Sequence, residues 1–191
     1  RISLAPFGDE SNVSVHFAVT RTVRDAAALL DAVHGPAVGD RVIAPAPSRP
    51  YIQEVGADPG KLRIGFIDHH MTGAHIDTEC VQAVRDTCKL LESLGHHVEN
   101  SWPSALNNPD FSGKFTAIWS TNMSVSRNSL GQMLGREVTI NDIELMNWTM
   151  AEYAKKMTAT DYAQAVYTSM LFRRAVQQWW ADGWDLLVTP T

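Results

Sequence analysis

The chain has 191 residues, of which 45% are hydrophobic and 19% are charged, so it can bury a core and is not intrinsically disordered. Sixteen Lys and Arg residues against 21 Asp and Glu residues give a net charge of −5, which argues against the clustered basic face that nucleic-acid binding needs. The length favours one domain, or a large part of one, over two complete domains.

The sequence lacks the features of membrane insertion and secretion. No stretch reaches the roughly 18 consecutive apolar residues that span a bilayer, and the opening residues RISLAPFGDE contain no apolar signal core. We therefore expect a soluble, cytoplasmic protein that does not bind membranes. Cys80 and Cys88 lie in one predicted helix at a separation of roughly 12 Å, whereas a disulfide bridges at most about 7 Å. We expect two free thiols.

Both ends of the sequence resemble segments from the interior of a fold. Residues 1–4 are typical of the end of a strand and carry no helix-capping signal, and the apolar run 186–188 stands directly before the last three residues. We expect the chain to be an internal segment of a larger protein.

The first predicted helix covers residues 23–33. Thr22 and Asp25 form a capping-box pattern, and apolar residues then recur on one helical face. Gly35 and Pro36 end this helix. A proline-rich stretch extends to Pro50 and is predicted to be an ordered loop.

A strand, a helix and a second strand follow. Residues 62–67 are apolar and β-branched, a helix capped by Asp77 or Thr78 ends at Gly95, and residues 97–99 begin another extended segment. This order predicts a βαβ unit with parallel strands and a right-handed crossover.

The last third of the chain is predicted to be mainly helical. A helix is expected over residues 110–134, and a long helix from Thr158 or Thr160 through Trp180. The apolar run 186–188 is typical of a strand buried on both faces. Strands separated by helices predict the α/β fold class. Between the two long helices, Asn141 and Glu144 form a further capping pattern. It is accompanied by apolar residues expected to form a core stripe: Ile143, Met146, Met150, Tyr153 and Met157.

The strongest local group of polar residues follows the first predicted strand. It consists of Asp68, His69, His70, His75 and Asp77, which are metal-ligand types at the end of a strand where α/β proteins place their sites. Their spacing matches no compact metal motif, which favours a solvated loop leading into a helix cap. A small-molecule or metal-binding module without catalysis remains the alternative.

Other candidate groups favour structural explanations. Asp9 and Glu10 are typical of a solvated loop. Trp179, Trp180 and Trp184 are expected to pack in the core, with an aromatic ligand cage as the alternative. The sequence contains neither a GxSxG elbow nor a GxxxxGK[ST] loop. The residues by themselves therefore identify no catalytic group.

A series of short segments resembles the amidase-signature hydrolases across essentially the whole chain. It is similar above all to the bacterial branch that includes aryl-acylamidase-like and 6-aminohexanoate cyclic dimer hydrolase-like amidases. The segments begin with Arg1-Ile-Ser and continue in the family's order. They are Val19–Asp25, Ala26–Asp31, Gly39–Asp40, Ala44–Pro47, Arg49–Tyr51, Asp58–Arg63, Leu90–Glu99 and Leu186–Thr191.

The resemblance implies an α/β/α fold around a mixed sheet, with residues 1–191 forming one partial domain downstream of the family signature. It implies hydrolysis of a small-molecule amide by a Ser-cisSer-Lys triad, with backbone amides holding the oxyanion. No residue here matches that triad, so none is assigned to it, and the chain alone is expected to be inactive. The resemblance implies neither a metal nor a cofactor, and it is compatible with a homodimeric parent protein.

Two groups are predicted to contribute to substrate binding. Trp119, Asn122 and Met123 place an amide side chain between an aromatic and a thioether on the predicted helix 110–134, which suggests a cleft lining. Packing in the core is the competing explanation for each of them. Thr189 and Thr191 follow the last strand, a position that often carries binding groups.

Overall fold

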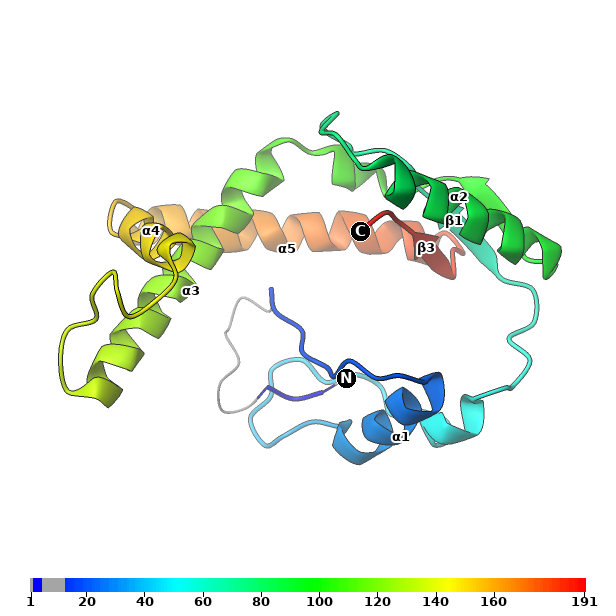
Figure 1. Cartoon of the computed structure of the whole chain (residues 1–191), viewed down its shortest axis with the longest axis horizontal. Coiled ribbons are helices and arrows are strands. Elements are labelled where there is room, and N and C mark those ends of the chain that lie inside the picture. Colours follow the sequence, from blue (N-terminus) through cyan, green and yellow to red (C-terminus); the bar gives the residue numbers. More distant parts are fainter. Residues whose placement is uncertain (1, 5–12) are drawn as a thin grey trace. The chain divides into compact units, whose positions relative to one another are not determined.

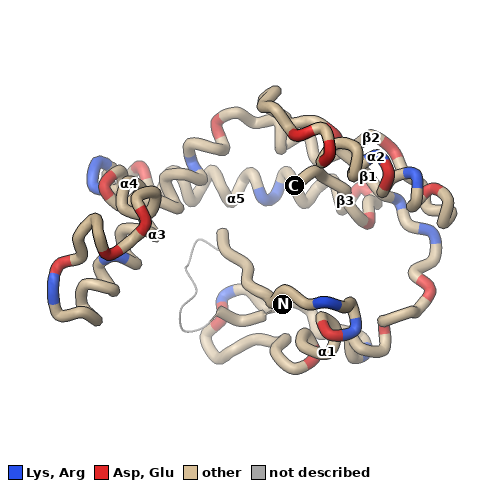
Figure 2. The backbone as a smooth tube through the Cα atoms, in the orientation of Figure 1, with Lys and Arg blue, Asp and Glu red and all other residues tan. Residues whose placement is uncertain are grey.

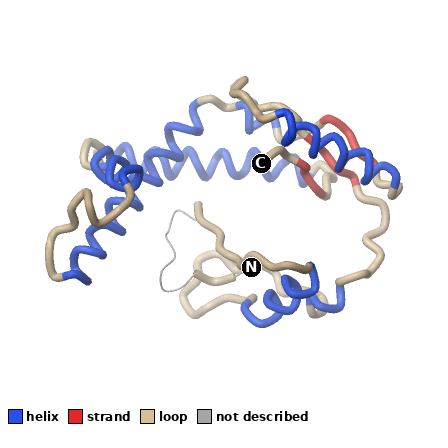
Figure 3. Tube along the Cα trace, in the orientation of Figure 1, coloured by secondary structure: helices blue, strands red, loops and turns tan. Residues whose placement is uncertain are grey.

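The computed structural model describes residues 2–4 and 13–191, and the chain divides into two compact units, Arg1–Pro59 and Gly60–Thr191. Asp9 and Glu10 lie outside the described residues. Helices account for most of the regular structure (Figure 3), and acidic and basic residues are interspersed along the elements of each unit (Figure 2). None of the helices in the described residues combines the length and apolar character that crossing a bilayer requires.

The first unit is organised around α1 (Val23–Val33) and the short 3-10 helix η1 (Tyr51–Glu54). The predicted bounds of α1 are confirmed, and Thr22 caps it by accepting a hydrogen bond from the Asp25 amide at 3.0 Å. Asp31, on α1, accepts hydrogen bonds from the amides of Tyr51 and Ile52 at 2.7 and 2.9 Å. A carboxylate of α1 thereby satisfies the free amides at the start of η1 and joins the two helices.

The second unit contains a three-stranded parallel sheet with the order β2-β1-β3 (Figure 1). Its strands are β1 (Arg63–Phe66), β2 (His97–Asn100) and β3 (Leu186–Val188), and α2 (Thr78–Ser93) joins β1 to β2. Asp77 is the N-cap of α2. The predicted parallel strand pair and the α/β class are confirmed. The mixed sheet implied for the whole fold stays a prediction, because all three described strands are parallel.

Aliphatic and tryptophan side chains are buried against the sheet. Trp179 and Trp184 stack with their ring centroids 4.7 Å apart, and each is only 8% exposed. The guanidinium of Arg63 lies 3.9 Å from the Trp184 ring centroid, and Trp179 Nε1 donates to Ser101 Oγ at 3.1 Å. The predicted core packing is confirmed for Trp179 and Trp184, whereas Trp180 is half-buried and meets Trp179 edge-on. Four further buried side chains of this unit are Ile64, Ile67, Val84 and Cys88. Because successive residues of a strand alternate between faces, Ile64 lies on the face of the sheet opposite to the one that Trp179 contacts at Gly65.

Three helices make up the rest of the second unit. They are α3 (Asp110–Leu134), α4 (Leu145–Ala154) and α5 (Ala159–Ala181), and the 3-10 helix η2 (Ser104–Asn107) precedes them. The long helix α3 contacts both α4 and α5 (Figure 1). The predicted bounds of α3 are confirmed, and Thr158 and Asp161 form a complete capping box at the start of α5. Cys80 and Cys88 both lie on α2 as free thiols, as predicted.

Three local predictions in this unit are wrong. Glu144 is the N-cap of α4 but makes no side-chain capping bond. The expected core stripe fails at Met146 and Tyr153, which are 59% and 49% exposed. The strand β3 is not buried on both faces, because Leu186 is 48% exposed and Leu187 and Val188 are only half-buried.

Candidate functional site

The carboxyl ends of the three strands lie at one edge of the sheet because the strands are parallel. Asp68 follows β1, Trp102 follows β2 and Thr191 follows β3 within three residues of each strand end. In α/β folds this edge is where ligand-binding groups gather. The predicted residue Thr191 therefore stands near the candidate residues that follow β1.

Asp68 makes the strongest polar contact at this edge. Its Oδ2 atom accepts hydrogen bonds from Nε and Nη2 of Arg85 on α2, at 3.0 and 2.9 Å. The Asp68 side chain is only 20% exposed. These bonds from Arg85, opposed by burial and assisted by nearby His69, hold the pKa of Asp68 below its ordinary value. Asp68 thus stays ionised and ties the end of β1 to α2.

The histidines after β1 point to different partners. The His69 ring meets the Trp102 ring edge-on, with centroids 5.0 Å apart. His70 Nδ1 accepts a hydrogen bond from the Thr72 amide at 3.2 Å. Within residues 2–4 and 13–191, no group of three or more His, Cys, Asp or Glu side chains is placed to hold a metal ion. In this loop Asp68 is engaged by Arg85, and the rings of His69 and His70 contact different partners.

Thr191 is held near this edge through its backbone. The Sγ atom of Cys80, on α2, donates to the Thr191 carbonyl oxygen at 3.0 Å. The side chains of Thr189 and Thr191 are both exposed. This exposure leaves both hydroxyl groups accessible from solvent, and their role in substrate binding stays a prediction.

The other predicted site residues share one face of α3. Trp119, Asn122 and Met123 follow the helical spacing i, i+3, i+4. Trp119 is 38% exposed and packs against Phe115 with ring centroids 5.4 Å apart, while Asn122 and Met123 are half-buried. The face therefore offers one accessible aromatic surface with an amide group beside it. The contribution of this face to substrate binding remains a prediction.

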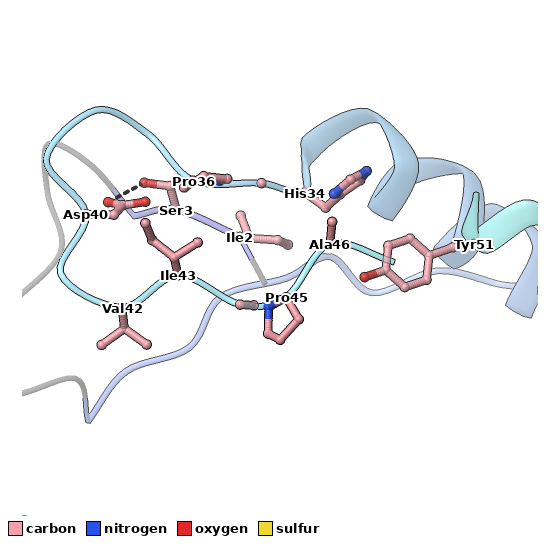
Figure 4. Close-up of a pocket in the computed structure, with 12 residues that line it drawn as sticks. Ile2, Ser3, His34, Pro36, Asp40, Val42, Ile43, Pro45, Ala46 and Tyr51 are labelled. Atoms are coloured by element: carbon pink, nitrogen blue, oxygen red, sulfur yellow. Dashed lines mark hydrogen bonds between the residues drawn. The ribbon is translucent and has the colours of Figure 1, made fainter. Parts of the chain in front are cut away.

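A cavity in the first unit was not predicted from the sequence. It has a volume of about 280 Å³ and lies among the N-terminal residues, the end of α1 and the proline-rich loop (Figure 4). The sequence features that point to it are the Gly39-Asp40 pair and the prolines of residues 44–47. From the sequence alone, they indicate only the family resemblance and an ordered loop. Its polar lining residues, which the prediction missed, are Ser3, His34, Asp40 and Tyr51.

A second cavity, of about 570 Å³, lies among α3, α4 and α5. Its lining includes Lys114, Tyr153, Lys156 and Asp161. The predicted residues Trp119, Asn122, Met123 and Thr191 line neither of these two cavities. Both groups of predicted residues therefore lie on surfaces outside these two hollows.

Comparison with known proteins gives the family. A family model described as Amidase matches residues 4–191. The chain belongs to the amidase family. It is 37% identical to the 6-aminohexanoate-cyclic-dimer hydrolase of Paenarthrobacter ureafaciens over 172 residues. The aligned region covers 90% of this chain and 35% of that protein. The chain is 27% identical over 184 residues to an acylamidase of Rhodococcus erythropolis, covering 94% of this chain and 36% of that protein.

Solved amidase structures match the fold as well. A structure of 6-aminohexanoate cyclic dimer hydrolase complexed with substrate has a TM-score of 0.80 and 37% identity, over 87% of this chain and 35% of that one. A bacterial aryl acylamidase of the amidase-signature family has a TM-score of 0.70 at 19% identity, over 90% of this chain and 35% of that one, and this match concerns the fold alone. The chain thus spans about a third of the length of the amidases it matches, and the predicted family is confirmed.

Proposed function

We propose that these 191 residues are part of an enzyme that hydrolyses carboxylic amides of small molecules in the cytoplasm. The observation that carries this proposal is the amidase match over residues 4–191, together with 37% identity to hydrolases of a cyclic amide. The substrate class is a linear or cyclic amide, and water supplies the oxygen of the new carboxylate.

The catalytic groups of the proposed reaction lie outside residues 1–191, which form a partial domain of the enzyme. A Ser-cisSer-Lys triad passes a proton from the nucleophilic Ser through the bridging Ser to the Lys, so each successive pair must lie within hydrogen-bond reach, about 2.6–3.2 Å. No residue of this chain matches the triad. This chain would supply sheet strands, covering helices and part of the substrate cleft, and no catalytic step is assigned to its own serines.

The binding role is assigned to Trp119, Asn122 and Met123 on α3, together with Thr191. Asn122 carries both a donor and an acceptor, so its side chain can bind the N–H or the C=O group of an amide. The exposed Trp119 offers an apolar surface to the chain of the substrate. In this proposal the helix face orients the amide for attack by a nucleophile supplied by another part of the enzyme.

The test is carried out on the complete gene product with a short acyl anilide as substrate. Replacing Asn122 by Ala removes about one hydrogen bond, so kcat/KM is expected to fall roughly tenfold. Asn128→Ala is the matched control, because Asn128 is exposed on the same helix but lies away from this face. Equal kcat/KM values for the two variants would mean that this face of α3 does not line the substrate cleft. Complete absence of amide hydrolysis in the wild-type product would contradict the proposed function itself.

A further inference from the structure

The cavity of the first unit has polar groups at two ends and an apolar middle (Figure 4). Asp40 and Ser3 stand at one end, and His34 and Tyr51 stand at the other. Between them the walls are formed by aliphatic and proline side chains. They include Ile2, Ile43, Pro45 and Ala46. Its volume of about 280 Å³ lies near the lower end of the range of about 300–1,000 Å³ for small-molecule pockets.

The Asp40 carboxylate is fixed in place by the turn that carries it. Its Oδ1 atom accepts a hydrogen bond from Ser3 Oγ at 2.9 Å, and its Oδ2 atom accepts one from the Ala37 amide at 2.8 Å. The Asp40 amide donates to the Ala37 carbonyl oxygen at 3.2 Å, which closes the turn. Gly39 within this turn has φ +95°, a conformation that L side chains rarely adopt. The carboxylate is therefore pre-positioned, and each oxygen retains acceptor capacity beyond the bond described.

The opposite end is held from α1. Asp31 binds the amides of Tyr51 and Ile52 and so fixes the start of η1. The rings of His34 and Tyr51 meet edge-on, with centroids 5.5 Å apart. The Tyr51 hydroxyl oxygen is buried. Both ends of the cavity are thus set by carboxylates that hold backbone segments in place.

We propose that this cavity binds a primary amine that carries a short apolar chain. Among the twelve described residues that line the cavity, Asp40 is the only Asp, Glu, Lys or Arg, so this described lining carries a single formal negative charge. A protonated amine, with a pKa near that of lysine at about 10.4, is cationic at pH 7 and complements this carboxylate. The chain of the ligand then lies against Ile2, Ile43 and Pro45. This binding site is separate from the proposed amide-hydrolysing function and stands on the first unit alone.

The test is calorimetric titration of the protein with n-hexylamine at pH 7. We expect saturable binding with one site per chain. Hexanol and hexanoate serve as comparison ligands, because they keep the apolar chain and replace the ammonium by a neutral or an anionic group. Both are expected to bind at least tenfold more weakly, in line with the strength of a charge-assisted hydrogen bond. Equal affinity for hexylamine and hexanol would overturn the proposal.

Three variants locate the site. Asp40→Asn is expected to weaken hexylamine binding at least tenfold, whereas Asp58→Asn removes the same charge outside the cavity lining and should leave it unchanged. Ala46→Phe should fill the cavity and leave the Asp40 carboxylate in place, so it should also abolish hexylamine binding. This variant tests the site if Asp40→Asn loses its native circular dichroism. Unchanged hexylamine affinity in a folded Asp40→Asn variant, or in the Ala46→Phe variant, would overturn the assignment.

Discussion

Asp68 binds Arg85 through two hydrogen bonds to a single carboxylate oxygen, and this contact joins the end of β1 to the helix that leads to β2. The two residues are seventeen positions apart in the sequence. The contact gives Asp68, one of the metal-ligand residue types that follow β1, a structural role in the βαβ unit.

This ion pair predicts a specific pH dependence of stability. The pKa of folded Asp68 is depressed below its ordinary value near 3.8, so its contribution is fully present above that value and is lost as the pH falls through the folded-state pKa. We expect Asp68→Asn to lower the free energy of unfolding by about 1 kcal/mol at pH 7, since Arg85 is largely exposed. Urea denaturation should show this difference shrinking below about pH 4.

The matched control for this prediction is Asp86→Asn. Asp86 lies on the same helix, is 61% exposed, and lies 3.7 Å from Lys89. Its Oδ1 atom accepts a hydrogen bond from Gln82 at 2.8 Å, which the amide oxygen of Asn can also accept. Its replacement should leave the free energy of unfolding unchanged at pH 7 and at pH 3. A difference between wild type and Asp68→Asn that persists undiminished at pH 3 would contradict the assigned role of the carboxylate.

Arg127 is predicted to be the main polar link between α3 and α4. Its side chain is only 11% exposed, its Nη1 atom donates to Glu152 Oε1 at 2.6 Å, and its guanidinium lies 4.9 Å from the Trp148 ring centroid. Arg127→Ala should lower the free energy of unfolding by about 2 kcal/mol, measured by chemical denaturation. Arg127→Lys should recover part of this loss, because it keeps the charge but not the planar guanidinium.

The control for Arg127 is Arg173→Ala on α5, since Arg173 is exposed. Its removal should change the free energy of unfolding by less than about 0.5 kcal/mol. If the two alanine variants have the same stability, the buried contact with Glu152 and Trp148 does not hold α3 to α4.

Gly65 and Gly113 form a pair of glycine positions with opposite predicted outcomes. A Cβ atom at Gly65, in the central strand, would overlap the Trp179 ring and the Ser101 carbonyl oxygen. Gly65→Ala should therefore destabilise the protein by about 1–3 kcal/mol. A Cβ atom at Gly113 on α3 meets nothing within 4 Å, so Gly113→Ala should stabilise by about 0.5–1 kcal/mol through helix propensity. Thermal melts of both variants check the signs, and a neutral Gly65→Ala would mean that Trp179 does not pack on β1.

Local sequence patterns predicted the elements of this fold well where one residue or period decides the structure. Thr158 with Asp161 forms the expected capping box, and the helix over residues 110–134 has the expected bounds. The pattern of Asn141 with Glu144 failed because α4 begins only at Leu145, so Glu144 itself is the N-cap. In the turn before it, a different carboxylate, Asp142, accepts hydrogen bonds from Arg136 and Thr139. Several side chains of one loop can compete for the same donors, and sequence spacing does not rank them.

The candidate sites were harder to predict because they depend on contacts between distant residues. The separation of Ser3 and Asp40 is 37 positions, and that of Cys80 and Thr191 is 111. No local periodicity encodes such pairs. The exposed aromatic face of α3 was identified as a candidate because an amide interrupts its apolar pattern, but the same pattern also suits packing on neighbouring helices.

The most direct test of the account is the rate of acyl-anilide hydrolysis by the 191-residue chain and by the complete product of its gene, assayed side by side. We predict hydrolysis by the complete product and none by the chain alone, since the triad is assigned to another part of the enzyme. Turnover by the chain alone that is abolished by mutating one of its own serines, such as Ser14 or Ser120, would contradict this account.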